Sequence, residues 1–371
     1  MERIKYETIT GMHFEATTKC GALCAMCGRN FKGKVRENLP LTELTLNDCK
    51  QIFEPNFIKQ LQFISICGVY GDPIYASEII EIIDYFYKCN GSLTINFYTN
   101  GSIHSRLWWR RLAKSIKRGY VIFGIDGIGE THSIHRCNTD YYKVIENAKS
   151  YIDAGGKAKW DFIVFRHNEH QIDAAREISE KLGFSSFQLK KTSRFFKQLY
   201  EEDSQLDSTF SEYGKHPIFN PNGEIIDYLE LPHNKKYVNH SEEQLLKLIK
   251  TYGSLENYFN RTRIDCQAIN TKGVFVSALG EVYPCCTVYQ QVCYGSIYNV
   301  QDDRELNEYK IYKNCNLSVF DHSIKEIVEG DFFNQLQNNW FLPSLKAGKP
   351  KSCCRSCGVE LNMHMAQHTD N

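Results

Sequence analysis

Residues 17–30 read TTKCGALCAMCGRN and place Cys20, Cys24 and Cys27 at the spacing C-x3-C-x2-C. A structural zinc site usually closes with four protein ligands, often as two C-x2-C pairs, and no fourth thiol lies beside this group. Thiolates also hold four-iron clusters, and three of them leave one iron open for a small molecule. The spacing therefore favours an iron–sulfur cluster with an open position. The alternatives are a zinc site completed from elsewhere in the chain and three unligated thiols.

Composition narrows the class of protein. The chain has 371 residues, 42% apolar and 24% charged, which suits one large or two modest domains. Its formal net charge of zero gives no overall attraction for nucleic acid or an anionic membrane. The sequence contains neither a long apolar run typical of a transmembrane helix nor an apolar signal-peptide core at its start. We therefore expect a cytoplasmic protein whose fifteen cysteines bind metal or are buried singly.

Apolar strands and amphipathic helices alternate between residues 13 and 193, a pattern typical of parallel βα units. The loops that follow the strands in such a fold meet at the carboxyl edge of the sheet, where functional side chains gather. The expected strands cover residues 13–17, 63–67, 93–101, 120–127, 158–165 and 186–193.

The cysteine loop after the first strand resembles the signature of the radical SAM enzymes. Cys20, Cys24 and Cys27 match it, although the family usually has an aromatic residue where this chain has Met26. The resemblance implies an α/β fold with a partial (βα)6 barrel. It also implies a [4Fe-4S] cluster whose fourth iron is chelated by the amino and carboxylate groups of S-adenosyl-L-methionine (SAM). Reductive cleavage of SAM would give a 5′-deoxyadenosyl radical that removes hydrogen from a substrate C–H bond, with flavodoxin or ferredoxin as the reducing partner.

The same resemblance implies cofactor contacts at the strand ends. YGDP (70–73) resembles the Gly-Gly-Glu-Pro segment that binds the amino group of the methionine moiety, although an ordinary turn is the alternative. TNG (99–101) and IDG (125–127) resemble segments that face the nucleoside. Arg136 would pair with the carboxylate of SAM, and Arg194 would face SAM or an anionic substrate group, unless these arginines are only solvated. The expected cofactor-binding residues are Gly71, Asp72, Asn100, Asp126, Arg136 and Arg194.

A second group of cysteines lies in the C-terminal third. Cys266, Gly280 and Cys285 match the opening of the SPASM/Twitch auxiliary-cluster domain, within a predicted hairpin around Gly280. The pair Cys354 and Cys357 would complete four ligands for an auxiliary [4Fe-4S] cluster, in the one-cluster Twitch version. A zinc site on the same four thiolates is the alternative. Two neighbouring cysteines, Cys286 and Cys353, are alternative ligands.

The chain divides into three expected regions. Residues 1–196 form the barrel, residues 197–262 form a polar insertion that could cap it, and residues 263–371 form the Twitch-like hairpin and helices. Only nineteen residues precede Cys20, so the peptide-binding domain common in peptide maturases is not expected. This favours a small polar substrate such as a sugar or cyclitol, with the auxiliary cluster as electron acceptor. The alternatives are a peptide or protein side chain, a nucleotide or nucleic-acid base, and a non-catalytic Fe–S or zinc protein.

Overall fold

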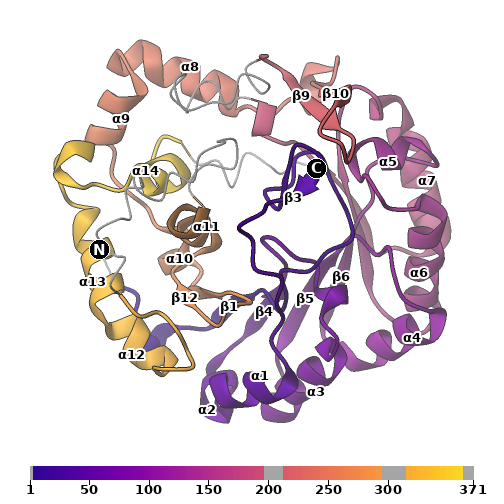
Figure 1. The fold of residues 1–371 in the computed structure, drawn as a ribbon, viewed down its shortest axis with the longest axis horizontal. Helices are drawn as coiled ribbons and strands as arrows, with labels where there is room; N and C mark the ends of the chain where they lie inside the picture. Colours follow the sequence, from indigo (N-terminus) through magenta and orange to yellow (C-terminus); the bar gives the residue numbers. More distant parts are fainter. Residues whose placement is uncertain (1–2, 196–211, 295–314, 362–371) are drawn as a thin grey trace.

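The computed structural model describes residues 3–195, 212–294 and 315–361, and these fold around one mostly parallel sheet (Figure 1). Its strand order is β12-β11-β1-β4-β5-β6-β7-β8. The predicted α/β architecture is confirmed, because strands from β1 to β8 in this order pair in parallel as successive βα units. These strands are β1 (Gly11–Phe14), β4 (Phe63–Ile66), β5 (Thr94–Thr99), β6 (Gly119–Gly124), β7 (Ala158–Ile163) and β8 (Ser186–Lys190).

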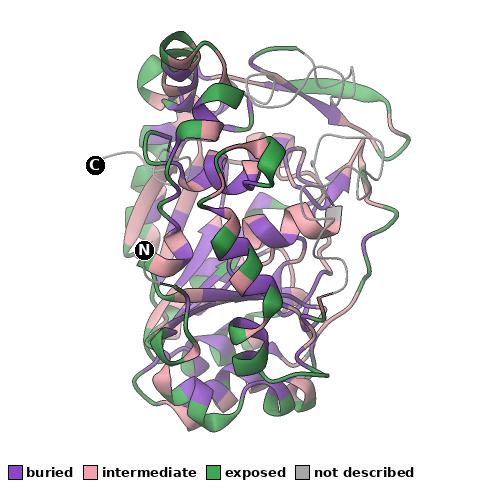
Figure 2. Ribbon diagram, turned by 90° about the vertical axis from the view of Figure 1, so that its left-hand side faces the viewer, coloured by how far each residue is buried: buried purple, intermediate pink, exposed green. Residues whose placement is uncertain are grey.

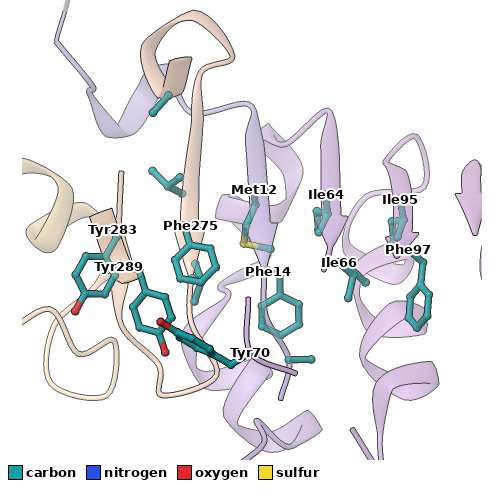
Figure 3. Packing of buried hydrophobic residues seen from close by; sticks show 14 of the residues in the cluster. Met12, Phe14, Ile64, Ile66, Tyr70, Ile95, Phe97, Phe275, Tyr283 and Tyr289 are labelled. Atoms are coloured by element: carbon teal, nitrogen blue, oxygen red, sulfur yellow. The ribbon is translucent and has the colours of Figure 1, made fainter. Parts of the chain in front are cut away.

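Helices of the βα units cover the outer face of this sheet, whereas the short helix α5 lies by the cysteine loop, where the Ala25 amide donates to the His135 carbonyl at 3.3 Å (Figure 1). Phe14 of β1 packs edge-on against Phe53 and Phe86, with ring centroids 5.3 and 5.9 Å apart. Figure 3 shows this apolar layer along neighbouring strands. The helices are α1 (Leu46–Ile52), α2 (Pro55–Gln60), α3 (Ile79–Cys89), α4 (Arg106–Ser115), α5 (Thr131–His135), α6 (Tyr141–Asp153) and α7 (Ile172–Leu182).

The first strand lies earlier than the sequence predicts, at Gly11–Phe14 instead of residues 13–17. The chain turns away because Thr17 pairs with residues 42 and 43: its hydroxyl donates to the Thr42 carbonyl at 2.7 Å, and Thr17 bridges to Glu43. A small hairpin of β2 (Asn30–Phe31) and β3 (Lys34–Val35) follows the cysteine loop. The cysteine loop therefore begins at the carboxyl end of β1, as predicted.

The predicted hairpin around Gly280 is confirmed. It consists of β11 (Gly273–Val276) and β12 (Val282–Tyr283), which pair antiparallel. Gly280 has a φ of 73°, a left-handed conformation that a residue with a side chain rarely adopts. Beyond the prediction, β11 also pairs in parallel with β1, so the hairpin extends the barrel sheet.

The remaining elements surround the open side of the sheet. Of the predicted insertion 197–262, residues 197–211 lie outside the described residues, and the rest forms an antiparallel hairpin and two helices. The division into three regions stays a prediction. These elements are β9 (Lys215–Phe219), β10 (Ile225–Glu230), α8 (Ser241–Tyr252), α9 (Leu255–Arg261), α10 (Gln267–Asn270), α11 (Cys286–Tyr294), α12 (Ile324–Glu329), α13 (Asp331–Asn339) and α14 (Lys351–Cys357).

Helix α11 packs against the inner face of the sheet. Its Tyr289 lies 5.0 Å from Phe275 of β11 and 5.8 Å from Tyr70, measured between ring centroids (Figure 3). Figure 2 shows buried residues along the strands and exposed ones on the outer helices. Among the described residues, no helix combines the length and apolarity needed to span a membrane.

Candidate active site

The carboxyl edge of the sheet brings the predicted site residues together. The cysteine loop follows β1, Gly71 and Asp72 follow β4, and Asn100 follows β5. Asp126 follows β6, and Arg194 comes shortly after β8. Because the strands are parallel, all these segments lie at one edge.

Polar side chains hold the backbone of the cysteine loop. Arg29 donates to the carbonyl of Thr18 and, at 3.2 Å, to that of Cys20. Asn30 donates to the carbonyl of Cys24 at 3.2 Å. Arg29 and Asn30 are both buried, so the loop has a fixed internal framework. No motif in the sequence singles out Arg29 or Asn30, although they stand two and three positions after Cys27.

The loop after β4 joins Cys20 to the end of β5. Asp72 accepts hydrogen bonds from the Asn100 amide at 2.7 Å and the Thr99 hydroxyl at 2.8 Å. The Asn100 side chain reaches the Cys20 sulfur, with 3.5 Å between Nδ2 and Sγ. Burial raises the pKa of Asp72 to about 6, against the opposing effect of these donors. Asp72 and Asn100 therefore lie beside the first cysteine, whereas their contacts with SAM stay a prediction.

A buried ion pair lies beside the second cysteine. Arg136 Nε donates to Asp126 Oδ2 at 2.6 Å, and the guanidinium also reaches the thiol of Cys24. Asp126 also binds His135 through Oδ2 at 2.8 Å, and its Oδ1 accepts the Ile163 amide at 2.7 Å. Burial disfavours the charge of Asp126, but Arg136 and His135 outweigh it, so the pKa of this carboxyl lies well below its usual range. Asp126 thus fixes the position of Arg136.

Two further side chains approach the loop around the third cysteine. Arg194 donates to the carbonyl of Met26, and His216 of β9 contacts the Ala25 carbonyl at 2.7 Å. A pocket between the loop and β9 is lined by residues that include Cys24, Cys27 and His216. The predicted insertion therefore contacts the cysteine loop through His216, which no motif in the sequence singles out.

Gly71 packs directly against the backbone that leads into the cysteine loop. A Cβ atom at this position would lie 1.8 Å from the Thr17 carbonyl oxygen. A side chain there would push the loop away from β4, because a backbone oxygen cannot yield like a flexible side chain.

We expect Gly71→Ala to lower the free energy of unfolding by about 1–3 kcal/mol, the usual cost of overpacking. The matched control is Gly91→Ala, where nothing lies within 4 Å of an added Cβ. We expect it to stay within about 0.5 kcal/mol of the parent. Urea unfolding of the apoproteins measures both, and equal stability of the two variants would contradict the tight contact.

Glu15 is a buried carboxyl group that the sequence analysis did not identify. Its Oε1 accepts amide hydrogen bonds from Val69 and Tyr70 at 2.6 Å and from Gly71 at 3.2 Å. Burial raises the pKa of Glu15 to about 7, against the opposing effect of these donors. Burial raises the pKa of the nearby Cys286 thiol, and the charge of Glu15 adds to that rise. Glu15 thus joins β1 to the loop that carries Gly71.

This pKa predicts a pH-dependent stability. The folded-state pKa of Glu15 is about 7 and its ordinary value 4.5, so the folded protein binds this proton more tightly. Stability is therefore lost as pH rises from about 4.5 to about 7, by roughly 3 kcal/mol at most. The unfolding free energy of Glu15→Gln, measured in urea from about pH 4 to about pH 8, should not show this loss, because glutamine does not titrate. If the unfolding free energies of the parent and of Glu15→Gln change with pH in the same way, the raised pKa of Glu15 is refuted.

The C-terminal cysteines form a second site. A pocket is lined by Cys266, Cys285, Cys353 and Cys357. The Cys285 sulfur accepts amide hydrogen bonds at the start of α11, and the thiol of Cys357 lies close to that of Cys266. Three of the four predicted ligands are thus together, whereas the thiol of Cys354 points to the carbonyl of Phe259 at 3.5 Å.

The donor sets of both sites fit iron–sulfur clusters. Thiolates are the usual ligands of such clusters, and a bound metal deprotonates a thiol that burial would otherwise keep protonated. Burial raises the pKa of Cys24 to about 12 and of Cys285 to about 11. Among the described residues, no three His, Cys, Asp or Glu side chains are arranged to hold a single metal ion.

Comparison with solved structures identifies the fold. SuiB from Streptococcus suis has a TM-score of 0.53 at 11% identity, over 87% of this chain and 66% of SuiB. SuiB bound to its precursor peptide SuiA has a TM-score of 0.51 at 12% identity, over 91% of this chain and 75% of that one. In the first comparison this chain thus spans just under two thirds of SuiB. This chain therefore shares the fold of SuiB. No family model matches the sequence, and no curated protein matches it.

Proposed function

We propose that this chain is a radical SAM enzyme that removes hydrogen from a C–H bond of a small polar substrate. One observation carries the proposal. The loop with Cys20, Cys24 and Cys27 lies at the carboxyl edge of a parallel sheet, and the side chains of Asn100 and Arg136 reach its thiols. Three thiolates would hold a [4Fe-4S] cluster and leave one iron for SAM. When bound and reduced, these cofactors supply a 5′-deoxyadenosyl radical for hydrogen abstraction.

The chain's own residues would position SAM. Arg136, with 19% of its side chain exposed, offers a guanidinium beside Cys24 to the methionine carboxylate. Gly71 and Asp72 would border the amino group, Asn100 the ribose, and Arg194 an anionic group at the far end of the sheet. Asp126 is buried and both of its oxygens accept hydrogen bonds, so we assign it the role of holding Arg136.

The inner face of the sheet supports a polar substrate. Phe14 and Trp160 pack outward against the helix layer, so alternate residues face inward. These include Ser65 and Asn96, which are partners in the sheet register, and Lys190, whose ammonium group lies 3.4 Å from Asp161. Charged and polar groups of both signs suit a sugar or cyclitol. A peptide, like the one bound to SuiB, is the alternative.

The second site would hold an auxiliary [4Fe-4S] cluster that accepts an electron or joins distant segments. Four cysteine ligands would leave its irons no open position, so we do not expect SAM there. A flavodoxin or ferredoxin would supply electrons to the first cluster. The cysteines of the described residues form no disulfide, which supports a cytoplasmic location.

Metal analysis and SAM cleavage test the proposal. Anaerobic reconstitution should give about eight irons and eight sulfides per chain, and dithionite-reduced protein should release 5′-deoxyadenosine from SAM. About four irons with about one zinc would make the second site a zinc site. Protein that contains both clusters but releases no 5′-deoxyadenosine would refute the proposed chemistry.

Cys266→Ala separates the two clusters. We expect it to lose about four irons and to melt at a lower temperature, because metal ligation is coupled to folding. It should still release 5′-deoxyadenosine, because the first cluster keeps its three cysteines. Differential scanning calorimetry and product analysis measure both effects. Loss of 5′-deoxyadenosine with the first four irons retained would show that the second site takes part in SAM cleavage.

A further inference from the structure

We infer that Cys353, and not Cys354, is the fourth ligand of the second cluster. The inference rests on the proposed function, in which this site holds a cluster. It departs from the C-x2-C spacing that the sequence analysis used, because it pairs Cys353 with Cys357 at C-x3-C spacing.

The geometry of α14 separates the two neighbouring cysteines. At about 100° per residue, Cys353 and Cys357 lie about 40° apart around the helix axis, on one face. The α14 residues that line the pocket are Ser352, Cys353, Ser356 and Cys357. Cys354 follows Cys353 by one residue and is therefore turned about 100° from it around the helix axis, away from Ser352 and Ser356. It is not among the residues that line the pocket.

Cys354 has a packing position against a different helix. Its side chain is completely buried, and its thiol donates to the carbonyl of Phe259 in α9. Helices α9 and α14 are in direct contact. Cys354 therefore belongs to the contact between α9 and α14, where a free cysteine acts as a small apolar residue.

The backbone fixes the other three cysteines around Cys353. The Asp265 amide donates to the Cys357 carbonyl at 2.7 Å, and Ile264 bridges to Gly358, so the end of α14 lies beside Cys266. Cys285 enters from the start of α11, and α11 contacts α14 directly. The thiols of Cys285, Cys353 and Cys357 line the same pocket as Cys266. Three separate segments thus direct four thiols into one pocket.

The test compares Cys353→Ala with its neighbour Cys354→Ala, each reconstituted anaerobically and analysed for iron and sulfide. The parent should hold about eight irons, Cys353→Ala about four and Cys354→Ala about eight. The irons of the first cluster, seen by EPR with SAM, report that a variant is folded. Each change is also made in protein whose Cys20, Cys24 and Cys27 are Ala, where the second cluster is measured alone.

The outcomes are distinct. Loss of the second cluster from Cys353→Ala, with its retention in Cys354→Ala, supports the assignment. The reverse pattern, or retention of all irons in both variants, overturns it. If the second cluster is absent from the parent and from the protein with the triple change, the proposed auxiliary site fails. If Cys353→Ala misfolds, Cys354→Ala still tests the assignment. Loss of about four irons from Cys354→Ala would by itself refute it.

Discussion

Replacing Cys20, Cys24 and Cys27 together with Ala should abolish release of 5′-deoxyadenosine and remove about half of the iron. The three thiols come from one loop whose backbone is held by Arg29 and Asn30. Their replacement removes the three thiolates that the proposed first cluster needs. Product analysis after dithionite reduction, together with iron analysis, measures both effects.

The matched control is Cys89→Ala. Cys89 is half-buried at the end of α3, outside both cysteine groups, so its replacement should leave iron content and 5′-deoxyadenosine release unchanged. If the triple variant still cleaved SAM at the parental rate, the triad would have no part in the chemistry. Loss of all iron from the triple variant would instead show that the second site depends on the first.

Asp126→Ala should cost about 3–5 kcal/mol of unfolding free energy, because it leaves the buried charge of Arg136 without its partner. Arg136 Nε lies 2.6 Å from Asp126, and the same carboxylate accepts the Ile163 amide and contacts His135. The substitution therefore leaves three groups without the carboxylate that binds them. Urea unfolding of the apoprotein at neutral pH measures the loss.

An exposed ion pair provides the control for Asp126. Glu146 lies 2.5 Å from Arg106 and 2.9 Å from Lys143, at side chains that are 34–72% exposed. Glu146→Gln should change the unfolding free energy by less than about 1 kcal/mol, since solvent screens exposed pairs. If both variants lose the same amount of unfolding free energy, burial does not make the Asp126 ion pair more important for stability than an exposed pair.

The sequence predicted those parts of the site that depend on local patterns. The alternation of strands and helices gave the parallel sheet, and the C-x3-C-x2-C spacing marked the loop at its edge. Asp72 and Asn100 were identified because their segments resemble strand-end motifs of the radical SAM enzymes, and the structure places both beside Cys20. These features are readable because each depends on residues close together in the chain.

Features that depend on tertiary packing were not predicted. Glu15 reads as one residue of an alternating strand, and only folding brings it to the amides of residues 69–71. The parallel pairing of β11 with β1 joins segments more than 250 residues apart, as the partners Gly11 and Gly273 show. Likewise, two adjacent cysteines on α14 look equivalent in sequence, and only the rotation of the helix distinguishes Cys353 from Cys354.

The central claim is that the N-terminal triad holds a cluster with an iron open to SAM. Electron–nuclear double resonance on the reduced protein, with SAM labelled with ¹⁵N at its amino group, tests it most directly. The account predicts a nitrogen coupling to the cluster in the parent and in Cys266→Ala, and none in the Cys20, Cys24 and Cys27 triple variant. A coupling that survives in the triple variant, or that is absent from the reconstituted parent, would contradict it.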